Sequence, residues 1–103
     1  MTDAVTDMAC HFAIEGELTI YTAADIKARL MPFFEKCPAL EIDLSHVSEM
    51  DTAGLQLLIL AKREYQARNG HLRLIGHSQP VLEVLDLCNM GSYFGDPVVV
   101  LRA

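Results

Sequence analysis

Apolar and polar residues follow one another along the chain with two different periods, one typical of helices and one typical of strands. The densest apolar run covers residues 55–65 and becomes amphipathic before Asn69-Gly70, which predicts a helix with a nearly buried first half. Apolar residues at helical spacing predict two more helices. One follows Thr22 and closes at Cys37-Pro38, and the other begins at Ser78-Gln79-Pro80 and runs to Leu87.

The helix that follows Thr22 carries two local signals. Thr22 precedes Asp25 by three residues, a pattern close to a capping box, so Thr22 is predicted to cap the helix start. Pro32 lies inside the helical pattern. Because proline lacks a backbone N–H, it should kink this helix or end its regular part.

Strands are predicted where β-prone apolar residues alternate with polar ones. Segments 8–14 and 18–21 flank Glu15-Gly16-Glu17, a natural turn, and therefore predict two strands joined by a tight turn. Segment 39–44 alternates in the same way and leads into a polar loop over 45–50. Two later strands are predicted over 71–75 and 97–101.

The predicted order β-β-α-β-α-β-α-β indicates an α/β fold. Right-handed crossovers would make the later strands parallel, giving a mixed, mostly parallel sheet packed against helices. The length and composition fit a single domain over 1–103, with its core at about 9–101. The polar loop 45–50 would then leave the carboxyl end of a strand, where open α/β sheets present their ligand-binding and reactive groups.

Composition narrows the function classes. The chain has 103 residues, 51% hydrophobic content and a formal net charge of −6, and its eight basic residues are scattered. A nucleic-acid partner is therefore not expected, because binding to phosphate backbones needs clustered Lys and Arg. No apolar run reaches the roughly 20 residues that span a bilayer. No signal peptide is recognised at the N-terminus, so we expect no direct membrane insertion and a cytoplasmic location.

The cysteines and histidines show no ligand spacing. Cys10, Cys37 and Cys88 are odd in number and lie in apolar stretches, which predicts reduced, mostly buried thiols. The four histidines lack the spacing of metal-binding motifs. We therefore expect no metal and no cofactor.

The segment Met50-Asp51-Thr52-Ala53-Gly54 places a hydroxyl where the apolar helix begins. Helix N-termini leave N–H groups unsatisfied and carry partial positive charge, so a carboxylate, a hydroxyl or a phosphate ester is stabilised there. Thr52 could serve only as a helix cap, or it could accept a phosphate. Gly54 is unfavourable inside a helix, which predicts a close approach of another backbone, either from a partner or from a neighbouring strand.

Several short motifs, in this order and spacing, closely resemble the STAS domain of bacterial anti-sigma factor antagonists. The resemblance covers the chain from about Ala9 to Leu101. It is carried by Gly16-Glu17-Leu18 with Thr22-Ala23, Ile42-Asp43-Leu44-Ser45, Val47, Asp51-Thr52-Ala53-Gly54-Leu55 and Asn69-Gly70-His71-Leu72.

The resemblance implies a binding switch with Thr52 as the phosphoacceptor. In such proteins, a partner that is both an anti-sigma factor and a serine/threonine kinase of the GHKL type binds the unphosphorylated domain. Phosphorylation releases the domain, and a PP2C-type phosphatase resets it. The residues expected to contact the partner are Asp51, Gly54, Met50, Asp43, Glu17 and Tyr21.

Two other functions compete with the binding switch. Catalysis by Thr52 would need a general base and an oxyanion site, and the sequence carries no recognisable arrangement of this kind, so the protein is not expected to be an enzyme. The alternative is a constitutive STAS subunit of an ABC-type lipid transport complex, in which the threonine would contact the ATPase subunit without being phosphorylated.

Overall fold

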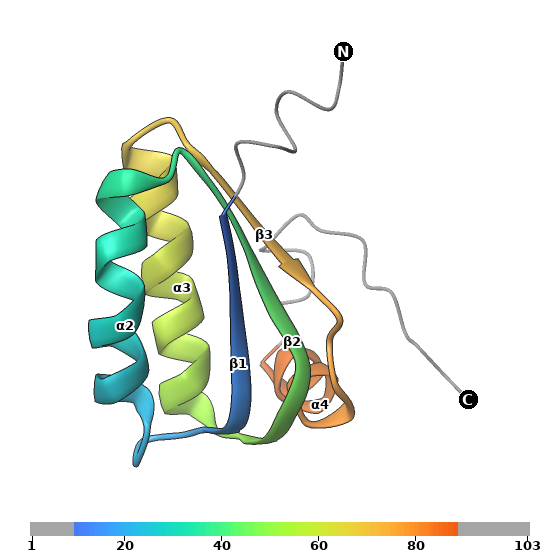
Figure 1. Cartoon of the computed structure of the whole chain (residues 1–103). Helices are drawn as coiled ribbons and strands as arrows, with labels where there is room; N and C mark the ends of the chain where they lie inside the picture. The colour runs from blue at the N-terminus through green and yellow to red at the C-terminus, as the bar shows by residue number, and fades with distance from the viewer. Residues whose placement is uncertain (1–9, 89–103) are drawn as a thin grey trace.

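Three parallel strands form the sheet, and two long helices cover one of its faces (Figure 1). The computed structural model describes residues 10–88. The elements are β1 (Cys10–Leu18), α2 (Ala23–Lys36), β2 (Ala39–Met50), α3 (Thr52–Ala67), β3 (His71–Ile75) and α4 (Gln79–Leu87). Strand β2 is central, in the order β1-β2-β3. The α/β class and its parallel sheet are therefore confirmed.

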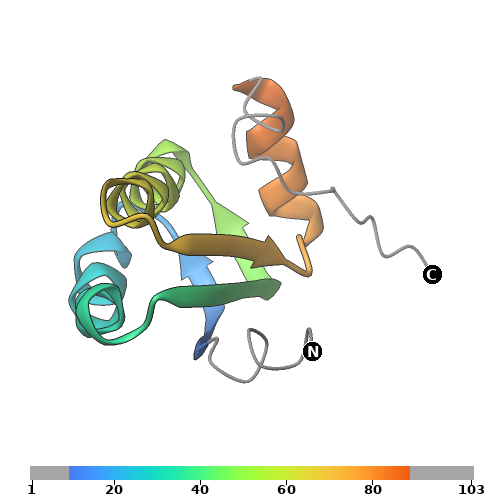
Figure 2. The same cartoon turned by 90° about the horizontal axis from the view of Figure 1, so that it is seen from above.

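Helices α2 and α3 pack side by side against the strands, and α4 lies near the carboxyl end of β2, where it contacts β2 and α3 (Figures 1 and 2). The predicted alternation in β2 is confirmed, since Leu40, Ile42 and Leu44 are all buried. The helix α3 contributes Leu55, Leu57 and Leu58 to the same core cluster and ends before Asn69, which has a left-handed backbone with φ 57°. The core therefore lies between the sheet and α2 and α3, and the buried Val81 and Leu85 of α4 extend it.

The prediction of a tight turn at Glu15-Gly16-Glu17 was wrong. β1 runs unbroken through Gly16, which has φ 84°, and its pairing with β2 shifts register on either side of this residue. The prediction of a polar loop over 45–50 was also wrong. This segment is part of β2, which continues to Met50 and pairs with β1. Polar residues and a glycine are tolerated here because the neighbouring strand satisfies the backbone groups.

Pro32 does not end α2, which continues to Lys36. Pro32 is exposed on the surface of α2. The carbonyl four residues earlier, which has no N–H partner because of the proline, can therefore be hydrated. Thr22 occupies the cap position of α2, as predicted, and its carbonyl accepts from the Ile26 N–H at 3.0 Å. The predicted capping box is absent, since the Thr22 hydroxyl makes no cap bond and Asp25 pairs instead with Arg29 at 3.8 Å. The helix predicted from residue 55 begins three residues earlier, at Thr52.

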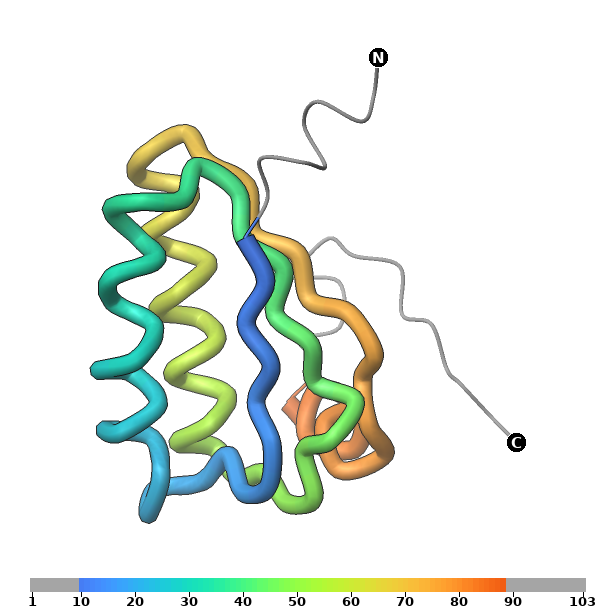
Figure 3. Tube along the Cα trace, viewed as in Figure 1, coloured from blue at the N-terminus to red at the C-terminus, as the bar shows by residue number. Residues whose placement is uncertain are grey.

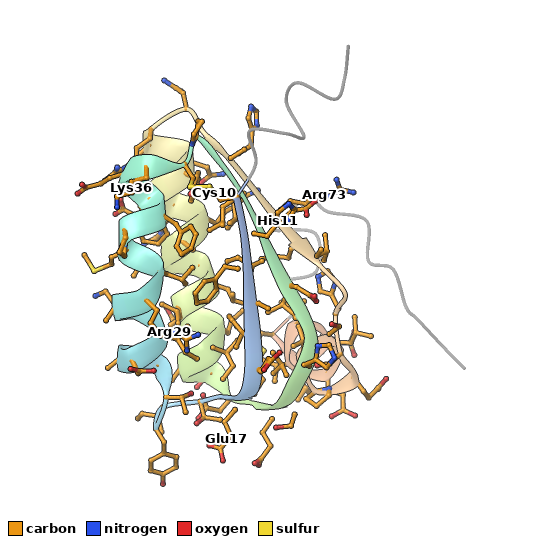
Figure 4. The ribbon with its side chains drawn as sticks, in the orientation of Figure 1. Cys10, His11, Glu17, Arg29, Lys36 and Arg73 are labelled. Carbon is orange, nitrogen blue, oxygen red and sulfur yellow. A yellow bond between two sulfur atoms is a disulfide. The ribbon has the colours of Figure 1, made fainter. Side chains whose placement is uncertain are left out.

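The prediction of reduced thiols was wrong for two of the three cysteines. Cys10, labelled in Figure 4, forms a disulfide with Cys37 at a Cα–Cα distance of 6.1 Å. Cys88 is exposed and free. The cause is topological: in a β-α-β unit, the end of the helix returns to the start of the first strand. Cys10 opens β1 and Cys37 follows α2, so the crossover brings them together across 27 residues.

The amino end of the sheet is further held by Tyr65. Its hydroxyl donates to the Phe33 carbonyl at 3.0 Å, and its ring meets the edge of Phe34 at a centroid distance of 5.7 Å. Burial raises the pKa of the Tyr65 hydroxyl, so it stays protonated as a donor. The strand predicted over 97–101 lies outside the described residues.

Candidate functional site

The carboxyl ends of β1 and β2 meet immediately before α3. Leu18 is paired with Met50, and the Asp51 N–H donates to the Leu18 carbonyl at 3.3 Å. As a result, the connection from β1 to α2 lies beside the connection from β2 to α3 at the lower edge of the molecule (Figure 3). The sheet thus joins two segments that are about 30 residues apart in sequence.

Asp51 holds both segments with one carboxylate. Its Oδ1 accepts hydrogen bonds from the Ala53 N–H at 2.9 Å and the Gly54 N–H at 3.1 Å, and so caps α3. Its Oδ2 accepts from the Ile20 N–H at 3.0 Å. The Ile20 amide is the main reason that the pKa of Asp51 lies below its usual 3.8. The carboxylate is therefore ionised at neutral pH, and both of its oxygens accept from backbone donors.

Thr52 is the first residue of α3 and its side chain is exposed. Since Asp51 is the helix cap, the Thr52 hydroxyl is not required for capping. Within residues 10–88, this hydroxyl has no hydrogen-bond partner. The structure therefore leaves the oxygen free at a positively polarised helix start, and it rules out the capping alternative.

Gly54 is buried in the first turn of α3, against the end of β1. A Cβ at this position would overlap the Leu18 carbonyl oxygen and would lie 2.7 Å from Leu18 Cγ. Of the two explanations for this glycine, the neighbouring strand is therefore the right one. Gly54 lets α3 start directly on β1, but its burial makes it a poor candidate for direct contact with a partner.

The loop between β1 and α2 presents two exposed apolar side chains. Ile20 is 68% exposed and Tyr21 is 89% exposed. The loop itself is ordered by Thr22, whose hydroxyl donates to the Glu17 carbonyl at 2.9 Å and accepts from the Thr19 N–H at 3.0 Å. The Thr22 hydroxyl thus organises this loop and makes no cap bond to α2.

Two exposed carboxylates border the same place. Glu17 and Glu49 are register partners at the ends of β1 and β2, and Figure 4 shows Glu17 at the lower end of β1. Met50 is half-buried and packs on the core. We call this set the Thr52 surface; it consists of the exposed residues Glu17, Ile20, Tyr21, Glu49 and Thr52 together with the half-buried Asp51.

The structure does not bring Asp43 to this surface. Asp43 lies seven residues before Met50 in β2, roughly 20 Å away at the usual rise of a strand. Its Oδ1 accepts from the Ser45 N–H at 2.9 Å, and this bond is the main cause of a pKa below 3.8. Asp43 therefore organises a local irregularity in β2, as a hydrogen-bond acceptor, and is a poor candidate for the partner contact.

Sequence reasoning missed Ile20. No local signal marks its amide as a partner of Asp51, because the bond joins residues 31 positions apart. In the described part of the chain, no group of three or more His, Cys, Asp or Glu side chains is placed to hold a metal ion. Among the helices within residues 10–88, none is both long and apolar enough to cross a membrane.

A family profile described as the STAS domain matches residues 2–99. The chain belongs to the STAS domain family. Among curated proteins, this STAS chain is similar to the anti-sigma-B factor antagonist of Bacillus subtilis (strain 168). The two are 29% identical over 77 residues, which cover 75% of this chain and 71% of the relative.

Solved structures share the fold. A Thermotoga maritima protein, whose role as an anti-sigma factor antagonist is itself inferred, superposes with a TM-score of 0.80 at 21% identity, covering 91% of this chain and 82% of its own. The unphosphorylated anti-sigma factor antagonist SpoIIAA gives 0.71 at 22% identity, with coverages of 87% and 80%. The STAS domain of a SulP transporter from Vibrio cholerae gives 0.64 at 22% identity, with coverages of 88% and 74%. These likenesses establish the STAS fold.

Proposed function

We propose that this chain is a single STAS domain that acts as a phosphorylation-controlled protein-binding switch. In its unphosphorylated form it binds an anti-sigma factor that is also a GHKL-type serine/threonine kinase, and phosphorylation of Thr52 releases that partner. A PP2C-type phosphatase restores the binding form. The anti-sigma-B factor antagonist among its relatives supports this class of partner.

The observation that carries the proposal is the free, exposed hydroxyl of Thr52 at the start of α3. In the modification step, this oxygen attacks the γ-phosphorus of ATP, the bond to the β-phosphate oxygen breaks, ADP leaves and the hydroxyl proton is lost. A kinase can reach an exposed first residue of a helix without unfolding the domain. The helix N-terminus then stabilises the phosphate within the same domain.

Charge explains why the complex would dissociate. The phosphate adds about −1.5 to −2 charges beside Asp51, with Glu49 close by. A partner surface fitted to a neutral hydroxyl would have to bury this dianion, and burying an uncompensated charge is costly. A loss of about 3 kcal/mol in binding free energy weakens a complex by roughly a hundredfold. The fold survives while the complex separates, as a binding switch requires.

The decisive experiment is phosphoryl transfer from the candidate kinase and ATP. We expect a mass increase of about 80 Da that maps to Thr52 and is retained in Thr52→Ser. Thr22→Ala is a control, because its hydroxyl is already used in the loop. Equal labelling of Thr52→Ala would overturn the assignment of the phosphoacceptor.

A second arm of this experiment measures binding without modification. Thr52→Glu should weaken the complex, while its melting temperature stays close to that of the wild type, because acidic residues are tolerated in a first helical turn. Equal affinity of both proteins by calorimetry would argue against charge as the cause of release. The transport-subunit alternative predicts no phosphoryl transfer to Thr52 and stable binding of the wild-type domain to an ABC ATPase.

A further inference from the structure

Beside Thr52, the β1–α2 loop presents a pair of apolar side chains that packing does not explain. Ile20 and Tyr21 are two of only four large apolar side chains that are strongly exposed in the described part of the chain. They are adjacent in sequence, and the other two, Met31 and Leu87, lie on different helices. An exposed tyrosine next to another exposed apolar side chain is typical of a protein interface, where tyrosine is a frequent anchor.

This loop is held in one conformation before any partner arrives. The Ile20 N–H is bonded to Asp51, the Tyr21 N–H donates to the Thr19 hydroxyl at 3.3 Å, and Thr22 ties the loop back to Glu17. An apolar pair on an ordered loop loses less conformational entropy on binding than one on a mobile loop.

The charges around the pair indicate the chemistry of the partner. Segments 15–25 and 45–56, which form this end of the molecule, contain five carboxylates and no lysine or arginine. A complementary surface would place basic side chains around an apolar pocket, because matched potentials speed association and reject surfaces of the same sign. Four of them (Glu15, Glu17, Asp25 and Glu49) are exposed, so they favour approach of the partner without having to be buried, whereas Asp51 is half-buried and bonded to backbone amides.

We propose that Ile20 and Tyr21 are the apolar anchors of the partner-binding surface, that they insert into an apolar pocket bordered by Lys or Arg on the partner protein, and that Asp51 is the positioning residue that holds them beside Thr52. This inference rests on the proposed function, because it specifies how the partner recognises the same surface. It gives Asp51 a role through Ile20 that requires no contact between Asp51 and the partner.

Two requirements of the proposal are compatible because they act at different places. The rim carboxylates attract a basic partner, whereas the Thr52 hydroxyl lies beside the apolar anchors, where water is excluded in the complex. A phosphate at that position would lose its hydration, and this loss outweighs the attraction of exposed rim charges. Recognition by a basic partner and release by phosphorylation can therefore coexist.

The test uses the kinase of the phosphoryl-transfer experiment as the probe, with ATP omitted, and measures affinity by calorimetry. Tyr21→Ala should weaken binding by about 30-fold and Ile20→Ala by about 10-fold, the range of buried interface anchors. The matched control is Met31→Ala, which removes an exposed apolar side chain, 52% accessible, from the outer part of α2. It should change affinity by less than about threefold.

The role of Asp51 needs a variant that separates its two functions. In Asp51→Asn, the side-chain oxygen can still cap α3, since asparagine is as good a cap as aspartate. The remaining group is an NH₂ donor, which cannot accept from the Ile20 N–H. We expect amide hydrogen exchange to become at least about tenfold faster at Ile20 but to stay nearly unchanged at Ala53 and Gly54, with affinity reduced by about tenfold.

The outcomes distinguish this inference from the function on which it depends. If Thr52 is phosphorylated but Tyr21→Ala and Ile20→Ala bind like Met31→Ala, the anchors are wrong and the switch stands. If Ile20 exchange is the same in Asp51→Asn and the wild type, Asp51 does not position the loop. If the kinase transfers no phosphate to Thr52 in any variant, the failure belongs to the proposed function.

Discussion

At the amino end of the sheet, β1 is joined covalently to the chain that follows α2, whereas at its carboxyl end the segments are held together mainly by the carboxylate of Asp51. Figure 4 shows Cys10 at the first end and Glu17 at the second. The amino end also has the buried Tyr65 and its bond to Phe33. The domain thus concentrates its covalent and aromatic contacts away from the surface that carries Thr52.

This division separates stability from recognition. An exposed polar surface held by a few hydrogen bonds can accept a large charge, while the rest of the core keeps its packing. If the comparison is right, variants at the amino end should change unfolding but leave the Thr52 surface intact. Variants at the carboxyl end should change the local structure or binding at a smaller cost in stability.

The largest effect on stability is expected from the disulfide. The double variant Cys10→Ala and Cys37→Ala should lower the free energy of unfolding by about 3 kcal/mol, because the bond closes a loop across 27 residues. Urea denaturation under non-reducing conditions measures this difference. Cys88→Ala is the matched control, since Cys88 is free and exposed, and it should unfold like the wild type.

The disulfide variant also tests the separation of the two ends. Its folded form should still exchange the Ile20 amide slowly, because the bond from Ile20 to Asp51 lies at the other end of β1. Faster exchange at Ile20 in the folded variant would mean that the two ends of the sheet are coupled and do not act independently.

An intermediate effect is expected at Gly54. Gly54→Ala should lower the free energy of unfolding by about 2 kcal/mol, because the overlap with Leu18 outweighs the gain of roughly 1 kcal/mol in helix propensity. Thermal or urea denaturation checks this, with the exposed Gln56→Ala in the same helix as control. A variant more stable than the wild type would show that the start of α3 is not seated on β1.

The smallest effect is expected from acid. The pKa values of Asp51 and Asp43 are lowered in the folded protein, by hydrogen bonds from Ile20 and Ser45 respectively. The unfolded chain therefore binds more protons below about pH 4, so this stabilisation is complete above the ordinary pKa of 3.8 and is lost as pH falls through the lower folded values.

Denaturation between about pH 2.5 and pH 6 measures this slope. Asp51→Asn should make it shallower, and Asp25→Asn is the control because Asp25 is exposed on α2. An unchanged slope in Asp51→Asn would show that the bond to Ile20 does not stabilise the folded state.

Local patterns were sufficient for α2, β3 and α4, whose periodic apolar positions lie within one element. They also placed Thr52 at a helix start, because the change from polar to apolar residues is local there. They failed for β1 and for the second half of β2, where a parallel neighbour stabilises polar residues and Gly16 in extended structure. The sequence of one segment alone does not predict its pairing with a distant strand.

Prediction of the site was also partial, because local patterns identify residues within one segment but not the contacts between distant segments. Thr52, Asp51, Glu17 and Tyr21 are found at one end of the sheet, whereas Asp43 lies elsewhere and Gly54 is buried. The disulfide and the bond from Ile20 to Asp51 join residues 27 and 31 positions apart. Both contacts depend on how the crossover places the helices in space. The spacing of residues along the chain does not predict this placement.

Asp51 accepts hydrogen bonds from three backbone amides, and this affects how the phenotype of an Asp51 mutation should be interpreted. A genetic screen for loss of partner recognition would recover substitutions at this codon, although the side chain forms its hydrogen bonds within the domain, to Ile20, Ala53 and Gly54. Suppressors of such alleles should then map to the β1–α2 connection in this same protein, before any are sought in the gene of the partner.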